Sequence, residues 1–148
     1  MNREIKFRGK DKQGRWWKGD LRHTMMELGK PHCRIVNVDK DDYDRLQEIW
    51  SDTIQEDTIG QFTGFYDTNG QPIYEGDILK CRIKTSEHIP YVVGYRLGLF
   101  ETRPNNQDLA SSPLKYLLND DDEGTALKSW TVIGNIHDNP ELMEGGAQ

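Results

Sequence analysis

Two aspartates occupy matching places in two short Gly-Asp-aliphatic sequences, "GDL" at 19–21 and "GDI" at 76–78. Paired carboxylates could share general acid and general base work in a reaction. Aspartate beside glycine also holds turns, because its side chain accepts hydrogen bonds from nearby backbone N–H groups. We interpret Asp20 and Asp77 as turn residues, and the sequence therefore predicts no catalytic pair.

The other residue types that perform chemistry lack the spacing that the chemistry requires. The four histidines include no His-x-x-x-His pair, and the chain has neither a Gly-x-x-x-x-Gly-Lys-Ser/Thr loop nor a Gly-x-Ser-x-Gly elbow. Carboxylates at Asp39, Asp41, Asp42 and Asp44 are spaced roughly as in a calcium loop, but the glycine required at its sixth position is missing. The sequence predicts no enzyme activity, no metal site and no cofactor.

Cys33 and Cys81 are the only cysteines. A zinc site would need further cysteine or histidine at short spacing, and neighbouring His32 and Cys33 do not provide it. The amino-terminal "MNREIKFRGK" has no apolar block after its charges, and no apolar run approaches the roughly 20 residues of a membrane-spanning helix. We expect two reduced thiols in a soluble, cytoplasmic protein.

The elements that position these residues are predicted to be short strands. The chain is polar, with 34% apolar and 30% charged residues, but four Trp, six Tyr and four Phe provide large side chains for a core. Alternating runs separated by glycine-containing turns predict strands at 5–8, 16–21, 33–38, 77–84, 88–103 (two strands) and 129–136. This pattern predicts a mostly β fold with few short helical turns.

The segment "DKDDYDRLQEIW" at 39–50 permits two interpretations. Asp41 or Asp42 could cap a short helical turn that places Tyr43, Leu46 and Ile49 or Trp50 on one side. A strand-plus-loop arrangement is the alternative. We expect little helix outside residues 40–50.

One skeleton occurs twice in the chain. Residues 7–21 and 62–78 each contain Phe-x-Gly, an aspartate three residues before a second glycine, and a closing Gly-Asp-aliphatic sequence. Two copies of one hairpin indicate a duplication, since solenoid arrays need three or more repeats. We predict an N-terminal β-unit at 1–60, a C-terminal β-unit at 61–140 and a flexible tail at 141–148.

The second copy predicts particular roles for four residues. Asp67 is expected to accept hydrogen bonds from the amides two or three residues further on, and Gly70 to adopt a positive φ. Gly76 and Asp77 are expected to reverse the chain again and to feed the following strand onto the inner face.

Basic residues are concentrated at the amino-terminal end. Residues 1–23 contain eight basic and three acidic residues, whereas the whole chain has a net charge of −6. The alternation of basic residues in "IKFRGK" at 5–10 is typical of the solvent face of a strand, although a polyanion could bind there. The candidate interaction surface is the adjacent stretch, where one of two neighbouring tryptophans must point outward: Lys12, Arg15, Trp16, Trp17 and Lys18.

Three blocks carry a resemblance to a known family: "REIKFRGKD" at 3–11, "QFTGFYDTNGQPIYEGDILK" at 61–80 and "VIGNIHDNPEL" at 132–142. In this order they closely resemble the YopX family of phage and prophage proteins. The resemblance implies a β-rich fold of SH3-like barrel or roll units and a phage or prophage origin. It implies no catalytic residues, and residues 22–57 and 103–128 match nothing in the family pattern.

Two hypotheses for function remain. The first is a binding or assembly protein, located in the cytoplasm of a phage or prophage host, that contacts an unknown protein partner or forms a homo-oligomer. The alternative is a nucleic-acid-binding accessory protein that uses the basic amino-terminal hairpin, with Trp16 or Trp17 stacking on a base. The net negative charge favours the first hypothesis.

Overall fold

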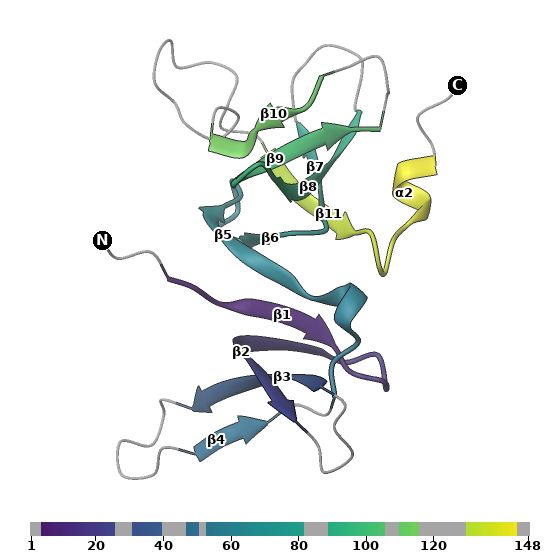
Figure 1. The fold of residues 1–148 in the computed structure, drawn as a ribbon. Helices are drawn as coiled ribbons and strands as arrows, with labels where there is room; N and C mark the ends of the chain where they lie inside the picture. Colours follow the sequence, from purple (N-terminus) through teal and green to yellow (C-terminus); the bar gives the residue numbers. More distant parts are fainter. Residues whose placement is uncertain are drawn as a thin grey trace. The chain divides into compact units, whose positions relative to one another are not determined.

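The computed structural model divides into two compact units, residues 1–62 and 63–148 (Figure 1). The division lies two residues beyond the predicted boundary at 60. The structure describes residues 4–25, 31–39, 47–50, 53–81, 89–105, 110–115 and 130–144.

The first unit is an antiparallel sheet with the strand order β4-β3-β2-β1-β5. The β1–β2 hairpin pairs Lys10 with Trp16 and Phe7 with Gly19, and β3 continues the ladder by pairing Ile35 with Leu21. The strands and the one 3₁₀ turn are β1 Phe7–Lys10, β2 Trp16–Met25, β3 Pro31–Asp39, β4 Gln47–Trp50, η1 Glu56–Thr58 and β5 Gly60–Tyr66.

The core of the first unit lies on one face of this sheet. Cys33, Ile35 and Ile54 are buried there, and the ring of Trp17 packs against them. Successive side chains of a strand point to opposite faces, so Trp16 lies on the other face of β2. The alternation in the sequence therefore sends one tryptophan into the core and one away from it.

The second unit is a sheet with the strand order β10-β9-β8-β7-β11. Its buried cluster contains Ile73, Leu79, Val93, Leu114 and Trp130. The part of β5 beyond residue 62 belongs to this unit and neighbours β6. The other elements are β6 Pro72–Tyr74, β7 Asp77–Cys81, β8 Pro90–Arg96, β9 Leu99–Pro104, β10 Ser112–Pro113, β11 Trp130–Asn135 and the short helix α2 Glu141–Glu144.

The prediction of a mostly β fold is confirmed, since all but a few of the described elements are strands. The helical interpretation of 39–50 is wrong for residues 47–50, which form β4 and pair with β3; residues 40–46 lie outside the described part. Val36 lies opposite Trp50, and Asn37 lies opposite Ile49. The backbone N–H and C=O groups of β4 therefore bond to β3, and they are not available for the hydrogen bonds of a helical turn.

The predicted flexible tail at 141–148 begins with a helix: residues 141–144 form α2, and residues 145–148 lie outside the described part. The amides of Leu142 and Met143 donate to the carbonyls of Asn139 and Pro140, and proline suits the first turn of a helix. Neither sheet closes into a barrel among the described strands.

Candidate functional site

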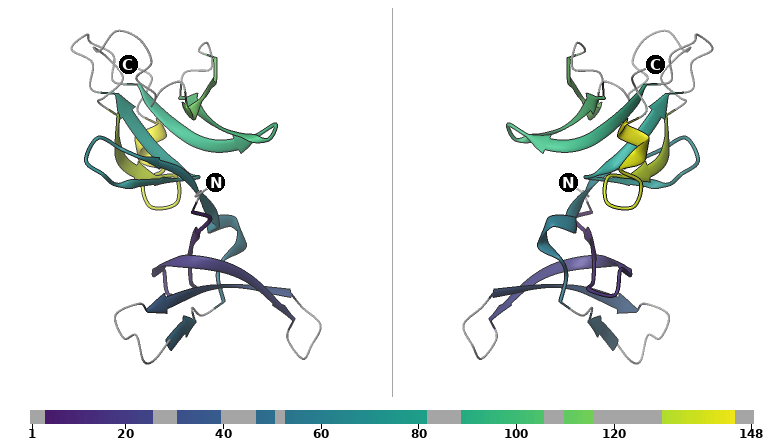
Figure 2. Two further views of the ribbon diagram at one scale, coloured as in Figure 1. Left: turned by 90° about the vertical axis from the view of Figure 1, so that its left-hand side faces the viewer. Right: turned by 90° about the vertical axis from the view of Figure 1, so that its right-hand side faces the viewer.

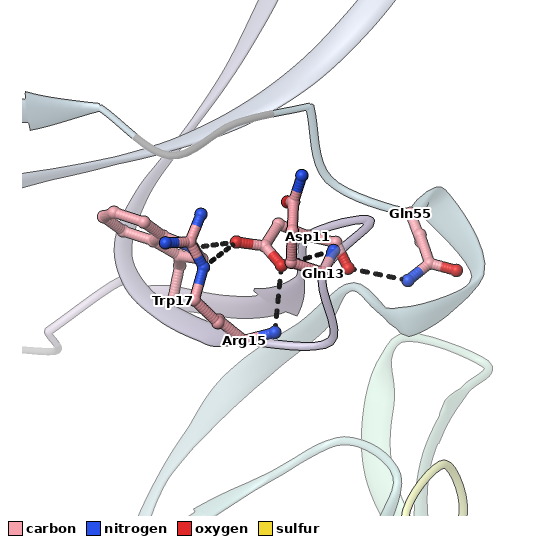
Figure 3. A network of polar contacts seen from close by, with 5 residues as sticks. All are labelled: Asp11, Gln13, Arg15, Trp17 and Gln55. Atoms are coloured by element: carbon pink, nitrogen blue, oxygen red, sulfur yellow. Dashed lines mark hydrogen bonds and ion pairs between the residues drawn. The ribbon is translucent and has the colours of Figure 1, made fainter.

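Asp11 organises the turn between β1 and β2 (Figure 3). Its Oδ1 accepts hydrogen bonds from the backbone amides of Gln13 and Arg15, both at 2.9 Å. Its Oδ2 accepts from Trp17 Nε1 at 2.9 Å and from Arg15 Nε at 2.7 Å. The Gln55 side chain donates to the Asp11 carbonyl at 2.8 Å, which ties the turn to the segment before η1.

The Asp11 carboxylate is fully buried, yet its surroundings favour the ionised form. Burial alone raises the pKa, but the hydrogen bonds from Trp17 and Arg15 together with the positive charge of Arg15 lower the pKa to about 2. The two backbone amides and the two side chains that donate to Asp11 therefore all meet a charged carboxylate oxygen. A proton on Asp11 would break part of this network.

Asp67 holds the corresponding turn of the second unit. Its Oδ1 accepts from the amides of Asn69 and Gln71, both at 2.8 Å, so the second amide is four residues on rather than the expected three. Its Oδ2 accepts from the Val132 amide of β11 at 3.0 Å. Gly70 has φ 79°, as the turn interpretation requires, and Gly14 in the first turn has φ 81°.

Asp20 and Asp77 differ in role, although the repeat places them in equivalent positions. Asp77 is buried, and its Oδ2 accepts from the Tyr74 amide at 2.8 Å, beside Gly76 with φ 80°. Asp20 is exposed within β2, opposite Val36 of β3. The expectation that Asp20 holds a turn is wrong, because β2 runs straight through this position to pair with β3. The two carboxylates lie in separate units.

The predicted interaction surface divides between the two faces of the hairpin. Trp17 packs on the core and donates to Asp11, and the Arg15 guanidinium lies 5.7 Å from the Trp17 ring. Lys12 and Lys18 are exposed. Trp16 is half-buried on the face opposite the core. Arg15 thus lies beside the inward tryptophan, Trp17.

The cations that contact Trp16 come from β1. Arg8 lies 4.9 Å and Lys10 lies 5.5 Å from the centre of the Trp16 ring. Lys6 lies 5.0 Å from the Phe62 ring. The candidate set taken from the sequence omitted these three residues, although their spacing of two along "KFRGK" already indicated that they share a face.

A second candidate surface lies at the tip of the β8–β9 hairpin, which Figure 2 shows as a curved ribbon ending in its turn. The turn residues Leu97 and Gly98 have φ 52° and 82°. The Leu97 side chain is 88% exposed, and Tyr95 and Leu99 beside it are 56% and 40% exposed. The sequence pattern does not point to this tip, because Leu-Gly is not a typical hairpin turn pair.

Metal ligands and thiols are two further kinds of candidate site. Among the residues that the structure describes, no three His, Cys, Asp or Glu side chains are grouped as metal ligands would be. Cys33 is buried and free, its Sγ lies 3.8 Å from Glu56 Oε1, and burial together with Glu56 raises the pKa of the thiol. The side chain of Cys81 lies outside the described part. No helix among the described residues is long and apolar enough to cross a membrane.

Comparisons with known proteins extend over nearly the whole chain. A family model described as YopX protein matches residues 6–144. The crystal structure of protein EF1440 from Enterococcus faecalis is similar, with a TM-score of 0.53 and 23% identity, over 95% of this chain and 98% of that chain. At this identity the similarity concerns the fold alone. No protein with curated annotation matches.

Proposed function

The chain belongs to the YopX family, and from this premise we propose that it is a non-enzymatic binding protein that acts through contacts with other proteins, copies of itself included. We place it in the cytoplasm of a cell that carries a phage or prophage, and we propose that each of its two units is an SH3-like roll. Protein contact is favoured by one feature of the second unit.

That feature is the exposed leucine at the tip of the β8–β9 hairpin. A two-residue hairpin turn in which both residues have positive φ strongly prefers asparagine or glycine at the first position. Leu97 occupies that position with φ 52°, a conformation that costs a residue with a Cβ about 1–2 kcal/mol. It also leaves 88% of an apolar side chain in water. A partner that buries Leu97 would offset both costs.

The tip is built as a continuation of the core. Tyr95 lies directly opposite Phe100, with ring centres 5.2 Å apart in an edge-to-face arrangement. Val93, two residues before Tyr95 on the same face of β8, is buried in the core. The apolar stripe therefore runs outward from packed residues to exposed ones, which gives the tip a rigid base. Rigid apolar projections of this kind lose little entropy when a partner covers them.

Self-association tests the proposal on the purified full chain. Sedimentation velocity over a range of concentrations should show a larger species that grows with concentration for the wild type, and a monomer for Leu97→Asn. Ile133→Thr is the matched control, since it removes another exposed apolar side chain, 38% exposed on β11, away from the tip.

If the wild type stays monomeric, the proposal requires that the partner is a different protein. The tagged wild type and the tagged Leu97→Asn variant would then be recovered from induced host cells under identical conditions. The proposal requires a protein that the wild type and Ile133→Thr retain and that Leu97→Asn loses. Identical sets of proteins for all three would overturn it.

A further inference from the structure

The β1–β2 hairpin has a face on which basic side chains surround one aromatic ring. The pairing of Arg8 with Lys18 and of Lys10 with Trp16 places these four side chains on one side of the ladder, because directly opposite residues share a face. Lys6 extends the row by one step. We call this set, Lys6, Arg8, Lys10, Trp16 and Lys18, the basic-aromatic face.

The members of the basic-aromatic face differ in how much solvent reaches them. Arg8 is 8% exposed and lies 4.9 Å from the Trp16 ring, so it supports that ring from within the fold. Trp16, Lys10 and Lys6 are half-buried, and Lys18 is exposed. Lys6 also forms an ion pair with the exposed Glu4 at 3.1 Å. A ligand on this face would meet the Trp16 ring and three lysines, together with the exposed Asp20, which follows Lys18 by two residues on the same face of β2.

We propose that the basic-aromatic face binds single-stranded nucleic acid. The lysines Lys6, Lys10 and Lys18 would neutralise phosphates, and the release of counterions supplies most of such an affinity. The Trp16 ring would stack on a base, which only an unpaired strand presents. An aromatic ring on the surface of a sheet is a general way to bind unpaired bases. This site lies in the first unit and goes beyond the protein contacts proposed for the second.

The distribution of charge confines such binding to the hairpin. Residues 1–23 contain eight basic and three acidic residues, and the remaining residues contain 11 basic and 22 acidic ones. Asp11, one of the three acidic residues, is buried and faces its own turn. A polyanion is therefore attracted to one strip and repelled elsewhere, so binding should be local and strongly dependent on salt.

Fluorescence anisotropy with a labelled oligothymidylate at low salt tests this inference on the full chain. The pair Lys10→Gln and Lys18→Gln should reduce the slope of log affinity against log salt by about 1.4, at roughly 0.7 for each phosphate contact. Trp16→Ala should weaken binding about fivefold to a hundredfold, and Trp16→Phe should restore part of the loss. The matched control is Lys80→Gln with Lys115→Gln, which changes the net charge equally in the second unit.

Four results would overturn the inference. One is no salt-sensitive binding by the wild type. Another is an equal loss of affinity in the control pair, which would show attraction by net charge alone. A third is a matched duplex that binds as tightly as the single strand, with no effect of Trp16→Ala. The fourth is displacement of the oligonucleotide by equimolar polyglutamate, which would assign the face to an acidic protein. Circular dichroism spectra identical to that of the wild type would establish that each variant is folded.

Discussion

Asp11 and Asp67 make the same pair of backbone hydrogen bonds in two different hairpins: one carboxylate oxygen of each accepts from the amides two and four residues further along, at 2.8–2.9 Å. The other oxygen distinguishes them. In Asp11 it binds the side chains of Trp17 and Arg15, and in Asp67 it binds the Val132 amide of a distant strand. The two copies of the repeat therefore share the turn, but the groups that bind the second carboxylate oxygen differ between the two units.

Asp11→Asn should destabilise the protein at neutral pH, because the amide NH₂ would face the donors of Trp17 and Arg15 where a charged oxygen now accepts. The pKa of Asp11 is lowered from 3.8 to about 2, so the ionised carboxylate contributes stability that is fully present above pH 4 and is lost as the pH falls through 2. The difference in urea midpoint between wild type and variant should therefore be constant from pH 5 to pH 7 and shrink below pH 4.

Asp20→Asn provides the control in the same hairpin, since Asp20 is exposed on β2. It should leave the urea midpoint within error of the wild type at neutral pH. If the midpoints of Asp11→Asn and the wild type stayed equally far apart down to pH 2, the network around Asp11 would not depend on its charge.

Gly14→Ala and Gly70→Ala should each lower the free energy of unfolding by about 1 kcal/mol. Both glycines have φ near 80°, and no atom lies within 4 Å of the position that a Cβ would occupy, so the cost is conformational alone. Asparagine tolerates this conformation better, and the two Gly→Asn variants should therefore lose less. Urea denaturation would measure all four, and an Ala variant as stable as the wild type would contradict the assignment of that turn.

Gly9→Ala should cost more, about 1–3 kcal/mol, and for a different reason. An added Cβ would lie 2.5 Å from Ile54 Cγ2 in the core of the first unit. Ile54→Ala removes that atom, so the double variant should be more stable than the sum of the two single losses predicts. A double-mutant cycle in urea would measure this coupling, and strict additivity would show that Gly9 is not confined by Ile54.

Leu97→Asn should raise the free energy of unfolding of the monomer by about 1 kcal/mol while it removes association. Asparagine adopts the positive φ of this turn readily, and leucine does not. Leu97→Ala separates the two effects, because it removes the apolar side chain but keeps a residue that resists φ 52°. Urea denaturation at high dilution should rank Asn above Leu, with Ala no better than Leu.

The sequence predicted the elements whose reasons are local. Asp67 and Gly70 follow from turn chemistry alone, and the division near residue 60 follows from the repeat. Asp11 belongs to the same skeleton, but the sequence alone does not predict it as a site residue, because its hydrogen bonds depend on Trp17 folding back over the turn. The turn interpretation fails for Asp20, since Gly19, Asp20 and Leu21 all lie inside β2, whereas Gly76 lies in a turn and Asp77 begins β7.

Features that depend on pairing between strands could not be predicted in the same way. Arg8 and Lys10 lie beside Trp16 and reach it across the ladder, whereas the sequence neighbour Arg15 lies beside Trp17. Leu97 became a turn residue because Arg96 pairs with Leu99. Leu-Gly is not a typical hairpin turn sequence, so the register of the two strands fixed its conformation.

The position of β11 in the second sheet has a consequence for the order of events during synthesis. Its only described partner strand is β7, and that pairing joins residues 77–81 to residues 130–135. A nascent chain emerges with β7 long before β11, so β7 keeps an open edge while the intervening strands assemble. The Asp67 turn is completed equally late, because Asp67 Oδ2 accepts its hydrogen bond from the Val132 amide of β11. Folding of the second unit on the ribosome should therefore finish late.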